Sequence, residues 1–120
     1  MVLPDYLNNH QNRDAVLEIN TLSEFQSVIS GTENLIVIDY YALWCGPCMR
    51  FNPTYELLAK KYPNVTFCKI NFDNEQLKDV IKVCMIEILP TFCFFKKGDY
   101  LKKIVGADQT VIEGLIQQLA

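Results

Sequence analysis

The run NLIVIDYY at positions 34–41 restricts the fold more than any other stretch of the sequence. Between Leu35 and Tyr41 every residue except Asp39 is apolar or aromatic, and several are β-branched. Apolar runs without alternation are typical of a strand that is covered on both faces. The chain has 120 residues, which is enough to bury one such core. We therefore expect one α/β domain in which this run lies in the middle of a sheet.

Strand and helix patterns alternate along the rest of the chain. Apolar runs predict strands at 15–19 and 65–71, and a final pair of strands on either side of a turn at Lys97-Gly98. Helical spacing predicts helices at 22–30, 45–62, 75–82 and 109–119, with Thr21, Asp73 and Asp108 as N-caps and a kink near 49–52 caused by Pro53. Helical connections make the first three strands parallel, whereas the short turn makes the last two antiparallel. The expected fold is a central mixed five-stranded sheet with helices on both faces, formed by residues 15–120 after a polar lead-in at 1–14.

Composition and charge argue against several kinds of partner. The net charge is -3 and the basic residues are scattered, so we expect no nucleic-acid partner. No apolar run approaches the roughly eighteen residues of a membrane span. The start of the chain lacks the basic and apolar segments of a secretory signal, and five cysteines without framework spacing favour a reducing compartment. The cytoplasm is therefore the expected location.

Cys45 and Cys48 are separated only by Gly46 and Pro47, where the apolar run gives way to a helix. In a helix that begins at Cys45, their Cα atoms would lie about 5–6 Å apart, within the range of a disulfide. As a structural staple the bond would contribute little, since closing a four-residue ring is worth only about 2 kcal/mol. The helix N-terminus favours a thiolate at Cys45, whereas burial keeps Cys48 protonated. The spacing therefore predicts a redox pair, with Cys45 as nucleophile and Cys48 as resolving thiol.

Zinc binding is the alternative use of two cysteines at this spacing. A zinc site needs four ligands, and the only histidine, His10, lies in the lead-in. Cys68, Cys84 and Cys93 stand singly in apolar surroundings. We expect no metal, and we interpret these three thiols as small core residues unless one of them is exposed and open to regulatory oxidation.

Several separated motifs resemble the thioredoxin family. They are WCGPC at 44–48 after a strand that carries Asp39, Pro53 in the next helix, PTF at 90–92, FFKKGD at 94–99 and VGA at 105–107. The resemblance covers about residues 16–120 and implies a thioredoxin fold with the active-site strand in the centre of the sheet. It also implies that Cys45 is the attacking thiol and Cys48 its buried partner. The Gly46-Pro47 pair matches reducing thioredoxins rather than oxidases or isomerases.

The resemblance assigns roles to residues around the two cysteines. From the residues alone, an acid at the end of a strand such as Asp39 would be solvated. The resemblance implies instead that Asp39 is buried and accepts the proton of Cys48, directly or through water, with Lys69 nearby, although Lys69 could instead extend into solvent. It implies a cis peptide bond at Leu89-Pro90, which sequence alone would make rare. The implied substrate-docking surface consists of Trp44, Gly46, Pro47, Leu89, Pro90 and Gly106. For Trp44 alone, packing in the core is the competing interpretation.

The function implied by the resemblance is protein-disulfide reduction by dithiol-disulfide exchange, as part of electron transport and cell redox homeostasis. Expected partners are a thioredoxin reductase and clients such as peroxiredoxins or ribonucleotide reductase. FAD and NADPH would belong to the reductase, and we expect no cofactor in this chain. We also expect the chain to be a monomer. Leu43, Met49 and Arg50 depart from common family residues, which affects partner choice. Two alternatives remain: a binding module with an incidental disulfide, and an oxidase or isomerase of an oxidising compartment.

Overall fold

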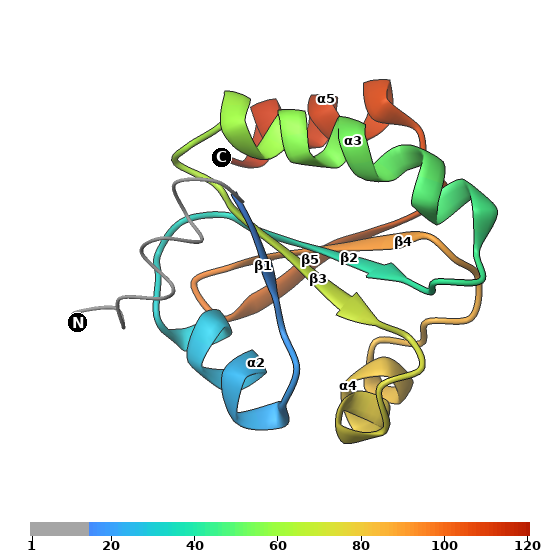
Figure 1. The fold of residues 1–120 in the computed structure, drawn as a ribbon. Helices are drawn as coiled ribbons and strands as arrows, with labels where there is room; N and C mark the ends of the chain where they lie inside the picture. Colours follow the sequence, from blue (N-terminus) through green and yellow to red (C-terminus); the bar gives the residue numbers. More distant parts are fainter. Residues whose placement is uncertain (1–14) are drawn as a thin grey trace.

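The computed structural model describes residues 15–120; the proposed lead-in at 1–14 lies outside the described residues. Strands and helices alternate over this part of the chain (Figure 1). The strands are β1 (Val16–Glu18), β2 (Ile36–Tyr41), β3 (Thr66–Asn71), β4 (Thr91–Lys96) and β5 (Asp99–Val105). The helices are α2 (Leu22–Ser30), α3 (Gly46–Lys61), α4 (Lys78–Val83) and α5 (Gln109–Leu119), with a 3-10 turn at Glu75–Leu77.

The five strands form one mixed sheet in the order β1-β3-β2-β4-β5. β3 pairs in parallel with both β1 and β2, while β4 pairs antiparallel with β2 and β5. The expected strand directions are therefore confirmed, and β2, which contains the apolar run, lies in the centre of the sheet. Since helices cover both faces of β2, its side chains can be apolar at successive positions rather than at alternate ones.

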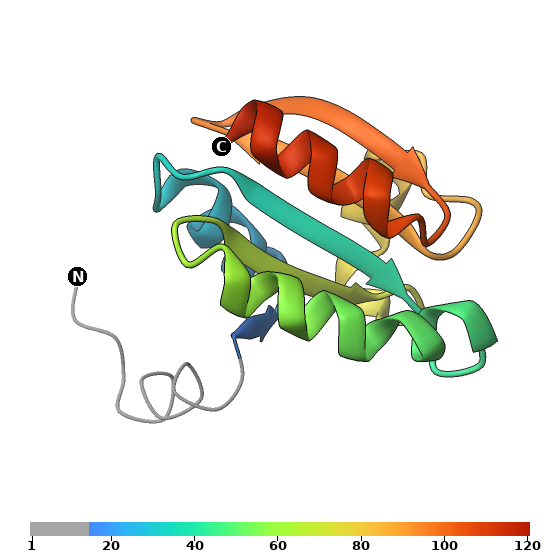
Figure 2. The ribbon, with the colours of Figure 1, turned by 90° about the horizontal axis from the view of Figure 1, so that it is seen from above.

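Successive residues of β2 enter two different cores. Val37 packs under α3 and α5, with Tyr55 of α3 and Ile112 of α5 in the same cluster. Ile38 packs on the opposite face, where α4 and the partly buried residues of α2 cover the sheet. Figure 1 shows these two layers, and Figure 2 looks down on α3 and α5 lying side by side. This alternation places every second side chain of β2, including Asp39, on the α3 face.

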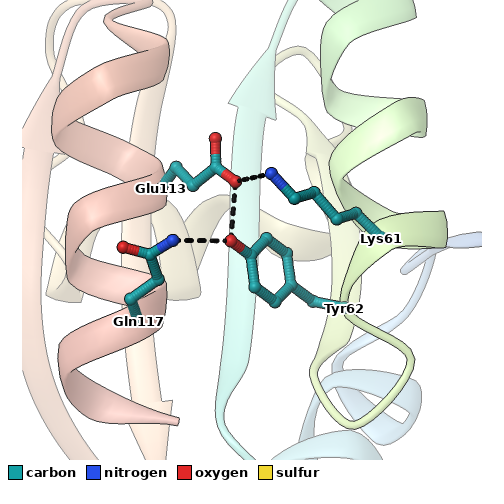
Figure 3. A network of polar contacts seen from close by, with 4 residues as sticks. All are labelled: Lys61, Tyr62, Glu113 and Gln117. Atoms are coloured by element: carbon teal, nitrogen blue, oxygen red, sulfur yellow. Dashed lines mark hydrogen bonds and ion pairs between the residues drawn. The ribbon is translucent and has the colours of Figure 1, made fainter.

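Helices α3 and α5 are joined at the surface by a small polar network (Figure 3). Glu113 of α5 accepts hydrogen bonds from Lys61 and from the Tyr62 hydroxyl, both at 2.6 Å. Gln117 of α5 donates to the same Tyr62 oxygen at 3.0 Å. The network joins the C-terminal end of α3 to α5, at the opposite end of α3 from the two cysteines.

Two of the three expected helix caps are confirmed and one is wrong. Thr21 and Asp108 cap α2 and α5, and α3 continues through Pro53 as one helix. The expected helix at 75–82 is instead a 3-10 turn followed by α4, and its cap is Asn74 rather than Asp73. Asn74 accepts the Gln76 N–H at 3.0 Å, because an amide oxygen caps as well as a carboxylate does. This leaves the Asp73 carboxylate free for a contact at the active site.

Candidate active site

Cys45 and Cys48 are joined by a disulfide, with their Cα atoms 5.3 Å apart. This separation confirms the spacing argument made from the sequence. Cys45 is the N-cap of α3, directly after the turn that follows β2, and Cys48 lies in the first turn of the helix. Both residues are buried and form a small cluster with Ala42. The pair can therefore open and close at a point where a rigid strand meets a rigid helix.

The local field at the start of α3 favours negative charge on Cys45. Its sulfur accepts the backbone N–H of Cys48 at 3.3 Å, and the first turn of α3 contains no acidic side chain. The Arg50 guanidinium lies so close to Gly46 that a Cβ added there would be 3.0 Å from its Nη1. An N-terminal helix dipole, a hydrogen bond and a nearby cation each lower the free energy of a thiolate. The geometry thus supports Cys45, rather than Cys48, as the more acidic thiol.

Asp39 is buried in β2 with only 3% of its surface exposed. Burial raises the pKa of its carboxyl to about 7; Lys69 acts in the opposite direction and Glu18 adds to the increase. Its Oδ1 atom has no hydrogen-bond partner among residues 15–120. A buried acid that titrates near neutral pH is suited to accept and return a proton. The alternative of a solvated Asp39 is therefore excluded.

Glu18, Lys69 and Asp39 lie in register across β1, β3 and β2. The Lys69 ammonium is 4.0 Å from Glu18 and lies over the Tyr41 ring, whose hydroxyl donates to Glu18 at 2.7 Å. A row of in-register residues shares one face of a sheet. Charges of alternating sign therefore extend from the edge strand β1 to the buried Asp39.

Trp44 is exposed, with 68% of its surface accessible, which excludes the core-packing alternative. Its indole N–H donates to the carboxylate of Asp73 at 2.8 Å. Gly46 and Pro47 are also exposed at the start of α3. The ring is thus held by one polar contact at its edge while its faces remain open, which is how aromatic residues commonly serve binding surfaces.

The segment before β4 borders the disulfide from another side. The Leu89-Pro90 peptide bond is cis, as the resemblance implied, and Leu89 packs against the cluster of Cys45 and Cys48. Pro90 is buried and its carbonyl accepts the Gly106 N–H at 2.8 Å. Gly106 has a φ of 97°, a conformation that glycine adopts without strain. The structure thus brings two of the docking residues, Leu89 and Pro90, to the active site and places Gly106 beside Pro90.

Three residues near the site were not found by sequence reasoning. Tyr41 and Phe72 pack against the Cys45–Cys48 cluster, and Asp73 binds Trp44. Phe72 and Asp73 directly follow β3, and the Phe72 N–H donates to the Tyr41 carbonyl at 2.7 Å. Their positions at the carboxyl ends of β2 and β3 could have indicated them, since the carboxyl ends of neighbouring parallel strands meet at one edge of the sheet.

The other three cysteines, Cys68, Cys84 and Cys93, are buried and unbonded, as expected of core residues. Within residues 15–120, no three His, Cys, Asp or Glu side chains gather as a metal site would require. None of the helices in the described part of the chain is long and apolar enough to cross a membrane.

Comparison with known proteins decides which family this site belongs to. The thioredoxin family model matches residues 16–118. The chain belongs to the thioredoxin family. It is 43% identical over 106 residues to a thioredoxin-like protein of Acanthamoeba polyphaga mimivirus, covering 88% of this chain and 77% of that protein. It is 37% identical over 105 residues to thioredoxin of Oryctolagus cuniculus, covering 87% of this chain and 98% of the rabbit protein.

Solved structures agree with this assignment. The crystal structure of oxidised mitochondrial thioredoxin 3 from Saccharomyces cerevisiae is 36% identical, with a TM-score of 0.80 over 88% of this chain and 96% of the yeast chain. This confirms the thioredoxin fold expected from the sequence. With a disulfide between Cys45 and Cys48 at the family's redox site, the protein is a thiol-disulfide oxidoreductase.

Proposed function

We propose that this thioredoxin reduces disulfides of client proteins, with Cys45 as nucleophile and Cys48 as resolving thiol. The Cys45 thiolate attacks one sulfur of the client disulfide, which forms a mixed disulfide and releases the other sulfur as a thiolate. Cys48 then attacks the Cys45 sulfur, which closes the Cys45–Cys48 disulfide and releases the client as a dithiol. Two electrons pass to the client in each cycle. The observation that carries this proposal is the disulfide at the N-terminus of α3.

Asp39 is proposed to accept the proton that Cys48 loses when it attacks. Two observations support this role: Asp39 lies on the face of β2 covered by α3, and it is buried. This burial raises its pKa to about 7. An acid with this pKa exchanges protons in both directions at neutral pH without a large free-energy cost. Lys69 and Glu18 are proposed to hold this value near neutrality through their opposite effects on Asp39.

Clients are proposed to dock on Trp44, Gly46, Pro47, Leu89, Pro90 and Gly106. Leu43, beside Trp44, is 72% exposed and enlarges the apolar part of this surface. A client segment that carries apolar residues next to its disulfide would bury this area on binding. We propose that Leu43 and Arg50 bias the choice of client, because both are departures from common family residues near the disulfide.

A thioredoxin reductase is proposed to reduce the Cys45–Cys48 disulfide again, with electrons from its FAD and NADPH, so that this chain works without a bound cofactor. The chain is also proposed to work as a monomer. Electron transport, cell redox homeostasis and a cytoplasmic location are proposed on the same basis. Peroxiredoxins are proposed as clients, along with ribonucleotide reductase. One solved relative, 36% identical with a TM-score of 0.79 over 87% of this chain and 95% of its own length, concerns thiol resolution in a yeast mitochondrial 1-Cys peroxiredoxin via glutathione and thioredoxin systems.

Reduction of insulin or of a peroxiredoxin disulfide, driven by NADPH and a thioredoxin reductase, tests the proposal. NADPH consumption should depend on this protein and should be abolished in Cys45→Ser. Cys48→Ser should instead accumulate a mixed disulfide with the client. Cys68→Ser is the matched control, since Cys68 is buried and remote in sequence from the pair, and it should retain wild-type turnover. Unchanged turnover in Cys45→Ser would overturn the assignment.

A further inference from the structure

A second pair of thiols lies on the opposite face of the sheet from α3. Cys84 is the C-cap residue of α4 and Cys93 lies in the middle of β4, and both belong to the core under α2 and α4. The active-site cysteines belong to a different cluster. Cys84 and Cys93 are therefore not part of the site described above.

A contact from β5 links the two segments that carry these thiols. Lys103 pairs with Cys93 in the sheet, and its ammonium donates to the carbonyl of Met85, the residue after Cys84, at 3.1 Å. The end of α4 is thereby tied to the strand that carries Cys93. Both thiols belong to the same buried cluster, and each affects the pKa of the other.

Polar groups surround this pair although the core around it is apolar. The Cys93 sulfur lies 3.1 Å from the Tyr100 hydroxyl, within hydrogen-bonding distance. The Tyr40 hydroxyl is fully buried beside Cys84 and has no conventional hydrogen-bond partner among the described residues. A buried hydroxyl without a polar neighbour is costly, and the Cys84 thiol is the polar group that interacts with this one.

The two thiols differ in how readily they ionise. Interaction with the Cys93 thiol lowers the pKa of Cys84; burial opposes this, while Tyr40 and Lys103 add to the decrease. The same interaction, followed by burial, raises the pKa of Cys93. Proton sharing of this kind makes one thiol the nucleophile and leaves the other as the proton donor.

Cys68 provides an internal comparison. It lies in β3 in the same core, it is fully buried, and burial alone raises its pKa to about 12. Cys84, in contrast, sits between the exposed residues Val83 and Met85 and is 5% exposed, so a small oxidant has only a short path to it.

We propose that Cys84 and Cys93 form a second redox-active dithiol, which small hydroperoxides oxidise to an intramolecular disulfide. The Cys84 thiolate attacks one oxygen of hydrogen peroxide, which breaks the O–O bond, gives a sulfenic acid and releases hydroxide. The Cys93 thiol then displaces the sulfenic hydroxyl as water and forms the S–S bond. In total two thiols and one peroxide give one disulfide and two water molecules, and two electrons pass to the peroxide. The inference goes beyond the proposed reduction of clients and does not depend on it.

Trypsin separates the five cysteines in a way that makes the test direct. No Lys or Arg lies between Lys82 and Lys96, so peptide 83–96 carries both Cys84 and Cys93, whereas peptide 62–69 carries only Cys68. The full chain, with its active-site disulfide already closed, is treated with increasing hydrogen peroxide and then alkylated and digested. Disulfide formation should remove two hydrogens from peptide 83–96 and make the peptide resistant to alkylation. This reaction should be at least about tenfold faster than oxidation of the free Cys68 thiol, because oxidation follows thiolate character and access.

Two variants separate the steps. Cys93→Ser should leave a sulfenic acid on Cys84 that dimedone traps, whereas Cys68→Ser should oxidise peptide 83–96 at the wild-type rate. The proposal is overturned if peptide 83–96 stays fully alkylatable at peroxide doses that oxidise Cys68, or if Cys84 advances to sulfinic acid in the wild-type chain without any disulfide. The peptide measurement on the wild-type chain stands even if a variant fails to fold.

Discussion

Replacing Asp39 with asparagine should stabilise the oxidised protein in a pH-dependent way. Burial raises the pKa of the Asp39 carboxyl from 3.8 to about 7 in the folded protein. Between these two pH values the unfolded chain has lost the proton while the folded protein still binds it. Since the folded state binds more protons, the free energy of unfolding falls as pH rises through this range. Below pH 4 and above pH 7 the contribution of Asp39 is constant.

The size of the effect follows from the distance between the two pKa values. They differ by about three pH units, and each unit corresponds to about 1.36 kcal/mol, so Asp39 destabilises the folded protein by about 4 kcal/mol above pH 7. The asparagine side chain cannot ionise and has nearly the same shape as the aspartate it replaces. The stability of Asp39→Asn minus that of the wild type should therefore grow by about 4 kcal/mol between pH 4 and pH 7.5, as an order of magnitude.

Urea unfolding followed by far-UV circular dichroism at several pH values measures this difference. Asp99→Asn is the matched control, because Asp99 is an exposed carboxylate at the start of β5. That variant should show no comparable change of stability with pH. A stability difference for Asp39→Asn that stays constant from pH 4 to pH 7.5 would refute the reasoning.

Three further predictions concern single contacts. The Tyr55 hydroxyl is buried between the carbonyls of Val37 and Cys68, at 3.1 and 2.8 Å, so Tyr55→Phe should cost about 1–3 kcal/mol in urea unfolding; a loss close to zero would contradict this. Asp73→Ala removes the acceptor of the Trp44 indole and should raise the KM for insulin about fivefold at a similar kcat, whereas Asp73→Asn, which keeps an oxygen, should not; equal KM values would show that the contact does not position Trp44. Gly106→Ala forces a side chain into a positive φ with no steric contact, so it should destabilise the fold by about 1 kcal/mol, and unchanged stability would contradict the strain argument.

The sequence was sufficient for features that depend on local patterns. The unbroken apolar run placed β2 in the centre of the sheet, and the cysteine spacing predicted a disulfide with the Cα separation that is found. The cis bond at Leu89-Pro90 came from the family resemblance alone, since local preference makes it rare.

Features that depend on register and topology could not be predicted. Asp73 and Asn74 are equally good caps, and only the fold decides that Asp73 turns toward Trp44, 29 positions away. The row of Glu18, Lys69 and Asp39 depends on how three strands align, because a shift of one residue would move each side chain to the other face. The placement of Cys84 and Cys93 in one cluster likewise depends on tertiary packing, which neither segment specifies by itself.

Alkylation of the reduced protein tests the central claim most directly, namely that Cys45 at the start of α3 is the attacking thiol. Limiting iodoacetamide is added between pH 5 and pH 9, and peptide fragmentation assigns the modified cysteine. Cys45 should be modified first, with a midpoint well below the ordinary thiol pKa of about 8.5, while Cys48 stays unmodified until the protein unfolds. Modification of Cys48 first, or of Cys45 with a midpoint at or above the ordinary thiol value, would contradict the account.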